Sequence, residues 1–327
     1  MPICDTSAYA APFFVPGGHL QTIVPSLFRR VSLLYWNRTR LDTIDGDFLD
    51  VDFHYTAKAV KKRRIAILCH GLEGDSHRAY IKGMARALCN AGWDVAAWNN
   101  RGCSGEPNIT LRSYHCGLID DLELVVKHCI EIGYGTVTLI GFSMGGNHIL
   151  SYLGQRGELL PTEVQCAVTF SVPCSLAASN ECLEQPESSL YTKRFLRSMK
   201  RKIREKHAQF PQDIDITRLA EITTLREYDD AYTAPLNGFR NAEDYWEKSS
   251  CGQFLQHITI PTLIVNAKND PFLRGDCYPV REVSPLKSVY LEMPEQGGHV
   301  GFMTRGTGGM YWSEKRALEF IAQALGY

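Results

Sequence analysis

Short apolar runs alternate with amphipathic segments along most of this chain. Continuous apolar runs of this length are typical of strands buried on both faces, and they occur at 64–69, 95–98, 136–141, 164–172, 260–265 and 289–291. Residues 48–55 alternate between apolar and polar, as a half-buried strand does. Helical spacing of apolar residues, such as Ile81, Met84 and Leu88, predicts helices at 80–91, 118–132, 147–153 and 311–325.

This alternation of strand and helix predicts an α/β fold with a mostly parallel, twisted sheet and helices on both faces. Ligands of such sheets bind at the carboxyl ends of the strands. We therefore look for chemistry at the residues that directly follow the predicted strands: His70, Arg101, Ser143, Pro173, Asp270 and His299.

One stretch, residues 174–252, interrupts the alternation, because it has charged and aromatic residues but no convincing buried strand. We expect a single domain over 1–327 with a helical lid inserted at 174–252. The alternative is a helical lobe that does not contact the site. The basic run from Lys193 to Lys206 is interpreted as a solvated helix face, and a membrane or acidic-ligand surface is the alternative.

Composition limits the function classes. The 327 residues carry a net charge of −1, which argues against a nucleic-acid or polybasic membrane partner but leaves local patches open. The eleven cysteines are scattered without a CxxC pair or a zinc spacing, which predicts no metal site and a reducing, cytoplasmic compartment. We find no secretory signal and no apolar run long enough to span a membrane. The oligomeric state cannot be read from the sequence.

The pattern G-x-S-x-G occurs at Gly141–Gly145, with Ser143 at its centre. An apolar strand precedes it and a helical segment follows, which is the context of a nucleophile elbow. Glycines flank the serine because side chains at those positions would clash in a strained turn. The turn lifts the Ser143 hydroxyl to the edge of the sheet and points the first helical amides at the reacting centre.

A serine hydroxyl needs a general base, and in this arrangement the acid and then the histidine follow the serine along the chain. We predict His299 as the base, because it lies in a glycine-rich loop after a late strand. Three other histidines also follow Ser143. His148 lies one turn into the helix after the elbow and is expected to be structural. His207 lies in the predicted lid, and His257 precedes a strand. Asp270 follows the strand at 262–265 and is the predicted acid, with Asp276 as the alternative.

An oxyanion requires two amide donors. The amide of Met144 is one candidate, because it follows the nucleophile, and the amide of Leu72, in the loop after Cys69, is the other. His70 precedes the serine, so we expect it to brace this loop and not to act as a base.

Five motifs together resemble the YheT-like branch of α/β-hydrolases, which also contains EMB8-like and ABHD1/ABHD3-type proteins. They are H-G-L-E-G at 70–74, N-R-G-C-S-G at 100–105, G-F-S-M-G-G-N at 141–147, N-A-K-N-D-P-F at 266–272 and G-G-H-V-G-F at 297–302. The opening G-H-L-Q-T at 18–22 is also similar to this branch. The resemblance implies the α/β-hydrolase fold and carboxylester hydrolysis, with some relatives acting on phospholipids or as alcohol acyltransferases. Animal members have an N-terminal membrane segment, so we expect this chain to be closer to the bacterial form.

We therefore expect a serine carboxylesterase or lipase-like enzyme that forms an acyl-serine intermediate on a small-molecule ester or lipid, without a cofactor. The alternatives are acyl transfer to an alcohol by the same acyl-enzyme and a non-catalytic binding protein. His115 and Asp120 have the His-x4-Asp spacing of acyltransferases, but Asp120 and Asp121 are also placed to open a helix, where carboxylates favour the dipole.

Overall fold

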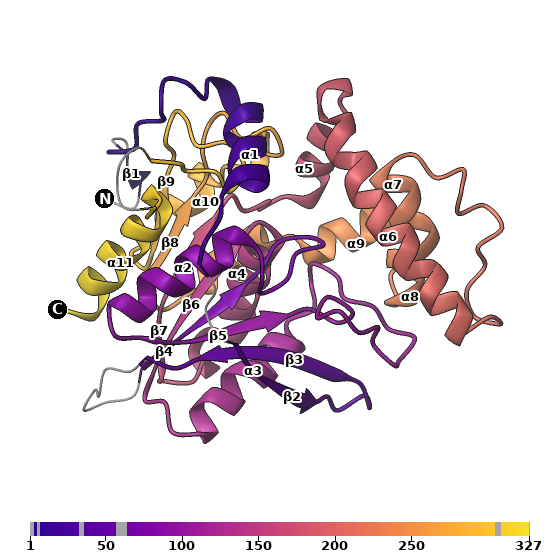
Figure 1. Ribbon diagram of the computed structural model, residues 1–327, viewed down its shortest axis with the longest axis horizontal. Coiled ribbons are helices and arrows are strands. Elements are labelled where there is room, and N and C mark those ends of the chain that lie inside the picture. The colour runs from indigo at the N-terminus through magenta and orange to yellow at the C-terminus, as the bar shows by residue number, and fades with distance from the viewer. Residues whose placement is uncertain (1–2, 5–6, 33–35, 57–63, 305–308, 327) are drawn as a thin grey trace.

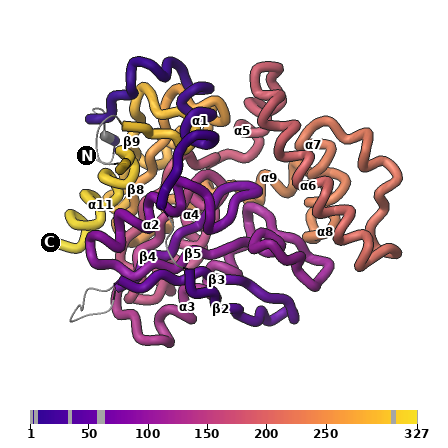
Figure 2. The backbone as a smooth tube through the Cα atoms, viewed as in Figure 1, coloured from indigo at the N-terminus to yellow at the C-terminus, as the bar shows by residue number. Residues whose placement is uncertain are grey.

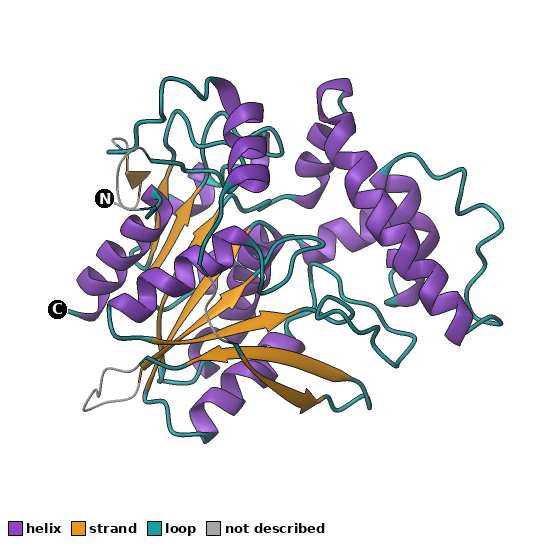
Figure 3. Ribbon diagram, viewed as in Figure 1, coloured by secondary structure: helices purple, strands orange, loops and turns teal. Residues whose placement is uncertain are grey.

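The computed structural model describes residues 3–4, 7–32, 36–56, 64–304 and 309–326. Nine strands form one sheet in the order β1-β9-β8-β7-β6-β4-β5-β3-β2 (Figures 1 and 3). Their bounds are β1 Ile3–Cys4, β2 Asn37–Asp42, β3 Phe48–His54, β4 Arg64–Cys69, β5 Asp94–Asn99, β6 Thr136–Phe142, β7 Val164–Phe170, β8 Thr262–Val265 and β9 Val289–Glu292. Only β2 and β3 pair antiparallel with their neighbours. The predicted mostly parallel sheet is therefore confirmed.

Helices cover both faces of the sheet (Figure 3). The longer ones are α1 Gly17–Phe28, α2 Ala79–Asn90, α3 Asp120–Glu131, α4 Met144–Arg156 and α11 Trp312–Leu325, and the short α10 is Val280–Val283. Helices α3, α4 and α10 pack on one face with Ile65 and Ile67 of β4. Helices α2 and α11 pack on the other face with Ala66 and Leu68. Successive β4 residues thus point to opposite layers, which explains its continuous apolar sequence.

The predicted elements agree with the structure to within a few residues, but four of the elements named here lie outside the sequence prediction: β1, β2, α1 and α10. Strand β2 reads N-R-T-R-L-D and is an exposed edge strand. Arg38 and Arg40 pair across to Asp52 and Asp50 on β3, with N···O distances of 2.7 and 2.9 Å. Charged pairs of this kind protect an edge from further strand pairing, and they also hide the apolar alternation on which the prediction depends.

Residues 174–252 lie between β7 and β8 and, as described, contain helices and no strand. The helices are α5 Leu176–Leu183, α6 Ser189–Gln209, α7 Leu225–Tyr228, α8 Ala234–Leu236 and α9 Ala242–Ser249. Figure 1 shows most of this group to one side of the sheet, beyond the carboxyl ends of the parallel strands. Its helices share an apolar cluster in which Leu196, Ile203 and Tyr228 meet Phe272 from the loop after β8. None of the described helices is both long and apolar enough to cross a membrane.

Candidate active site

Ser143 lies in the tight turn between β6 and α4, as the sequence predicts. Its backbone has φ 53° and ψ −121°, a conformation that a non-glycine residue adopts only at a cost. Its amide donates to Phe170 O at 2.8 Å, which ties the turn to β7. A Cβ at Gly145 would lie 2.2 Å from Cys69 O, so only glycine fits where α4 passes β4. The strained turn is therefore held from both neighbouring strands.

His299 and Asp270 lie beside Ser143. His299 Nε2 is 2.9 Å from Ser143 Oγ. His299 Nδ1 is 3.0 and 2.9 Å from the two Asp270 carboxylate oxygens. The Asp270 side chain is fully buried, and its Oδ1 also accepts from the Phe272 amide at 2.9 Å. The structure thus brings the three predicted side chains into one hydrogen-bonded chain.

The alternative residues lie elsewhere. Asp276 and His257 are exposed. His207 is bonded to Ile214 O at 2.7 Å, within the helical insertion. His148 is fully buried in α4 with its Nε2 2.8 Å from His115 O, and burial lowers its pKa to about 4. A neutral, enclosed imidazole of this kind agrees with the structural assignment.

The loop that carries His299 is held by side chains from three other segments. Four consecutive amides each donate to a side-chain oxygen: Gly297 to Gln21 at 2.8 Å, Gly298 to Asn269 at 3.0 Å, His299 to Thr22 at 2.8 Å and Val300 to Ser171 at 2.9 Å. Gln21 is 1% exposed and also accepts from the Asn269 amide group at 2.9 Å. It therefore links the loop of His299 to the loop of Asp270.

The sequence analysis did not assign Gln21 and Thr22 a role. Both lie on α1, which Figure 2 shows in indigo beside the orange and yellow C-terminal part of the chain. The only signal available was the G-H-L-Q-T motif at 18–22. Gly18 is part of the same junction, because a Cβ there would lie 1.8 Å from Asn269 O.

The two predicted oxyanion donors flank Ser143. Met144 is the first residue of α4, and the first amides of a helix have no partner within it. In the loop after β4, the amides of Gly71, Glu73 and Gly74 bond to Tyr80 Oη, Tyr114 Oη and Gly71 O. Within the described part of the chain, the Leu72 amide has no such partner. A Cβ at Gly71 would lie 3.1 Å from Ser143 Cβ, so this loop runs directly against the serine.

His70 and Arg101, which also follow strands, serve the scaffold. His70 is 1% exposed, and its Nε2 accepts from the Asn100 amide at 3.1 Å, which braces the Leu72 loop against the next one. Burial lowers the pKa of His70 to about 4. Arg101 donates to both carboxylate oxygens of Asp121 at 2.8 Å, and its side chain is 2% exposed. Burial disfavours the guanidinium charge, but the carboxylates outweigh it and raise the pKa of Arg101.

His115 and Asp120 do not form a pair. His115 Nδ1 accepts from the Gly117 amide at 3.2 Å, and burial lowers the pKa of His115 to about 3. The Asp120 side chain is 66% exposed at the start of α3, 4.0 Å from Arg156. Its position at a helix N-terminus agrees with the structural interpretation.

A cavity of about 890 Å³ opens onto Ser143 and His299. Ser143, His299 and Leu72 line it from the sheet side, and α1 contributes Ile23 and Leu27. The insertion supplies much of the remaining wall, including Leu183, Met199, Tyr228 and Trp246. Within the described residues, no group of three or more His, Cys, Asp or Glu side chains is arranged to hold a metal ion.

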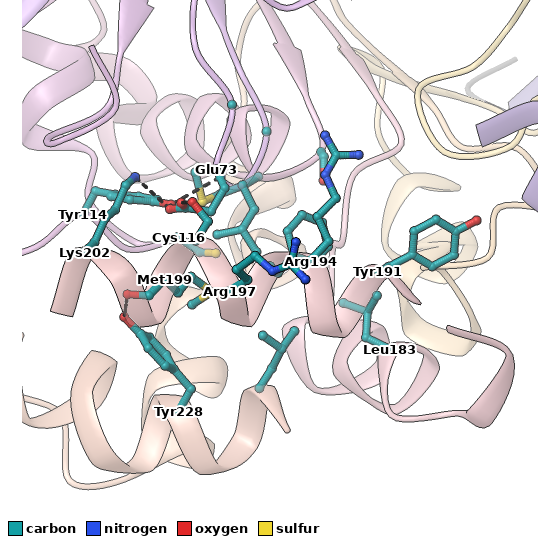
Figure 4. A pocket seen from close by; sticks show the side chains of 18 of the residues that line it. Glu73, Tyr114, Cys116, Leu183, Tyr191, Arg194, Arg197, Met199, Lys202 and Tyr228 are labelled. Atoms are coloured by element: carbon teal, nitrogen blue, oxygen red, sulfur yellow. Dashed lines mark hydrogen bonds and ion pairs between the residues drawn. The ribbon is translucent and has the colours of Figure 1, made fainter. Parts of the chain in front are cut away.

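Glu73 joins the Leu72 loop to helix α6, another feature that the sequence analysis missed. Its carboxylate accepts from Lys202 Nζ at 2.8 Å and from the hydroxyls of Tyr114 and Ser198 (Figure 4). The Glu73 side chain is 7% exposed. Burial favours the neutral acid, but Lys202 and the hydroxyl donors outweigh it and hold the pKa of Glu73 below its usual range. The residue that follows Leu72 is thus anchored to the insertion.

The comparisons with known proteins agree with this architecture. The α/β hydrolase fold family matches residues 67–306. The chain is 36% identical to the putative esterase YheT of Escherichia coli, over 87% of this chain and 84% of that protein. It is 30% identical to the phospholipase ABHD3 of Mus musculus, over 86% of this chain and 70% of that protein.

Solved structures show the same fold. An esterase of Pyrococcus furiosus superposes with a TM-score of 0.61 at 14% identity, covering 91% of this chain and 96% of that one. The ferulic acid complex of the esterase Est1E from Butyrivibrio proteoclasticus gives a TM-score of 0.56 at 14% identity, covering 88% of this chain and 100% of that one. The predicted α/β-hydrolase fold and the resemblance stated above are confirmed: the chain belongs to the YheT/ABHD3-type family of α/β-hydrolases.

Proposed function

We propose that this carboxylic ester hydrolase acts through an acyl-serine intermediate, with Ser143 as nucleophile, His299 as general base and Asp270 as the acid that orients it. The observation that carries the proposal is the continuous hydrogen-bonded chain from Ser143 Oγ through both His299 nitrogens to the buried Asp270 carboxylate. That arrangement is the one required to activate a serine hydroxyl.

In the acylation half, His299 Nε2 takes the hydroxyl proton as Ser143 Oγ forms a bond to the ester carbonyl carbon. The electron pair of the carbonyl moves to its oxygen. When this tetrahedral adduct collapses, the bond to the alcohol oxygen breaks and His299 returns the proton to that oxygen. In the deacylation half, His299 takes a proton from water as the water oxygen bonds to the acyl carbon. The bond from that carbon to Ser143 Oγ then breaks, and His299 returns the proton to Oγ, which releases the carboxylic acid. Asp270 stabilises the imidazolium in both halves.

The amides of Leu72 and Met144 are the proposed donors to the oxygen that becomes negative. Two fixed donors beside the N-terminus of α4 stabilise that charge without reorganisation. One such donor stabilises the transition state by about 3 kcal/mol. Ser143 is half-buried in its strained turn and lines the same cavity as Leu72 and Met144, which supports this assignment.

We further propose that residues 174–252 are a lid on a single hydrolase domain. Two observations support this over a remote lobe: the insertion lines the same cavity as Ser143, and α6 is bonded to Glu73 of the Leu72 loop. A cavity of about 890 Å³ is large for a small acetate ester and suits an ester with a long acyl chain or a glycerolipid. Two of the chain's relatives are named as an esterase and a phospholipase, which agrees with an ester or lipid substrate.

The acyl-serine is tested by fluorophosphonate labelling of the purified chain followed by peptide mass spectrometry. We expect a single adduct on Ser143 and no labelling after Asp270→Asn and His299→Ala are combined. Labelling at a different residue, or none in an enzyme that still hydrolyses p-nitrophenyl esters, would exclude Ser143 as the nucleophile. Product analysis with added alcohol then separates hydrolysis from acyl transfer.

Thr22→Val is expected to lower kcat for ester hydrolysis by about 10–100-fold, with KM nearly unchanged. The substitution keeps the shape of the side chain but removes the oxygen that accepts from the His299 amide, so the imidazole loses its fixed position relative to Ser143. Thr22→Ser should restore most of the rate. Steady-state kinetics and thermal unfolding are measured for both variants. A general loss of stability, in contrast to a misplaced imidazole, would change KM or lower the unfolding temperature in both Thr22→Val and Thr22→Ser.

A further inference from the structure

Helix α1 turns three large apolar side chains toward solvent, with the half-buried Val24 between them. Leu20, Val24, Leu27 and Phe28 stand at positions i, i+4, i+7 and i+8, so they form one stripe along the helix. Leu20 is 45%, Leu27 63% and Phe28 71% exposed. The buried residues of the helix are instead Gln21 and Pro25. An ordinary surface helix has the opposite orientation, with its apolar stripe toward the core.

The stripe continues into a larger exposed apolar surface. Phe13 and Phe14, in the segment before α1, are 80% and 56% exposed, and Leu190 at the start of α6 is 71% exposed. We call these residues the apolar rim: Phe13, Phe14, Leu20, Leu27, Phe28 and Leu190. In Figure 1, α1 and the beginning of α6 stand on the same side of the molecule. Exposed apolar surface gathered in this way marks an interaction site.

The rim lies at the mouth of the cavity. Leu27 from α1 and Leu190 from α6 are both exposed, and both line the cavity that contains Ser143. Whatever covers the rim therefore faces the cavity opening. A protein partner seated there would obstruct the substrate, whereas a lipid surface would both cover the rim and supply an ester.

The charge beside the rim is positive. Arg194, Arg197 and Arg201 follow Leu190 at i+4, i+7 and i+11 and are exposed, so they extend the same stripe of α6. They line the cavity mouth with Leu190 (Figure 4 labels the first two). Helix α6 has one acidic residue, Glu205, against the basic residues Lys193, Arg194, Arg197, Lys200, Arg201, Lys202, Arg204 and Lys206. The net charge of the whole chain, −1, conceals this local excess.

We infer that the apolar rim docks on an anionic phospholipid bilayer, with α1 lying in the headgroup region and the arginines of α6 contacting lipid phosphates. An exposed amphipathic helix flanked by basic residues is the structure that binds such interfaces. Docking brings the cavity mouth to the lipid, so an ester enters without crossing water. The choice of a lipid occupant rests on the proposed ester hydrolysis, whereas binding to vesicles can be measured without turnover.

The test uses the full chain with Ser143→Ala, which keeps the vesicles intact and separates docking from turnover. Co-sedimentation is measured with vesicles of phosphatidylcholine alone and with a phosphatidylglycerol mixture. We expect binding to the anionic vesicles that weakens as salt is raised. Adding Leu27→Ser and Phe28→Ser should weaken it by about tenfold or more, because each side chain loses its burial in the interface. The double substitution Arg194→Glu and Arg197→Glu should weaken binding to the anionic vesicles and leave binding to phosphatidylcholine vesicles unchanged.

Ile44→Ser is the matched control. Ile44 is as exposed as a side chain can be and lies in the turn between β2 and β3, away from α1 in Figure 1. Its variant should bind as the parent does. Equal binding by the rim variant and the control, or no binding to either vesicle, would overturn the inference. So would a concentration-dependent dimer in sedimentation velocity that the rim substitutions abolish, because the rim would then be a contact between two copies.

Discussion

Ser143→Ala is expected to lower kcat for the hydrolysis of p-nitrophenyl esters by about four to six orders of magnitude. The substitution removes the atom that forms the acyl-enzyme, and water has no equivalent position against the carbonyl carbon. His299 then has no hydroxyl within its 2.9 Å contact to deprotonate. The remaining rate should come from the amide donors and substrate binding alone. Steady-state kinetics with active-site titration measure the effect.

Four further variants make this result specific. His299→Ala should lose about as much activity as Ser143→Ala, and the double variant should lose no more, because the residues act as one unit. Asp270→Asn should lose about 10⁴-fold, since the amide favours the wrong imidazole tautomer. Ser284→Ala, at an exposed serine after α10, should keep the parent rate. A Ser143→Ala enzyme with the rate of the parent would refute the acyl-serine mechanism.

The three side chains that we propose to react could be named from the sequence because each lies in a locally constrained segment. The elbow needs Gly145, whose Cβ would collide with Cys69 O, and this requirement appears in the sequence as G-x-S-x-G. Asp270 and His299 each lie in the loop after a late apolar strand, so a parallel sheet puts them at one edge. The strand order, which the sequence did not predict, then places β8 and β9 on the same side of β6.

The supports of the site were not readable, because they join segments that are far apart in the chain. Gln21 and Gly297 are 276 residues apart, and a buried glutamine on a helix gives no periodic signal. Helix α1 was missed for a related reason: its apolar stripe faces solvent, and its buried face contains Gln21 and Pro25. The partner of Glu73 was also hidden, because Lys202 lies among many lysines and arginines of α6 that look alike in sequence.

Lys202→Met is expected to destabilise the fold by about 3 kcal/mol at neutral pH. The substitution leaves the Glu73 carboxylate buried without its cation, and removing one partner of such a pair is far more costly than removing both. The substitution also removes the 3.0 Å contact between Lys202 Nζ and Cys103 Sγ. Urea unfolding measures the difference. Arg201→Met is the matched control: the Arg201 side chain is 67% exposed, and its contact with Glu205 at 3.8 Å is a surface pair that contributes little.

Acid should reduce the difference between Lys202→Met and the parent. The pKa of Glu73 is held below its usual range in the parent, so the pair contributes stability above the ordinary pKa of a glutamate and loses it as the pH falls through the lowered value. In Lys202→Met the same carboxyl is buried without a cation, so it takes up its proton at higher pH and the penalty disappears. Glu73→Gln combined with Lys202→Met should be more stable than Lys202→Met alone at neutral pH. If the double variant is no more stable, the charge of Glu73 is not what Lys202 compensates, and the link from Glu73 to α6 depends on the Ser198 hydroxyl.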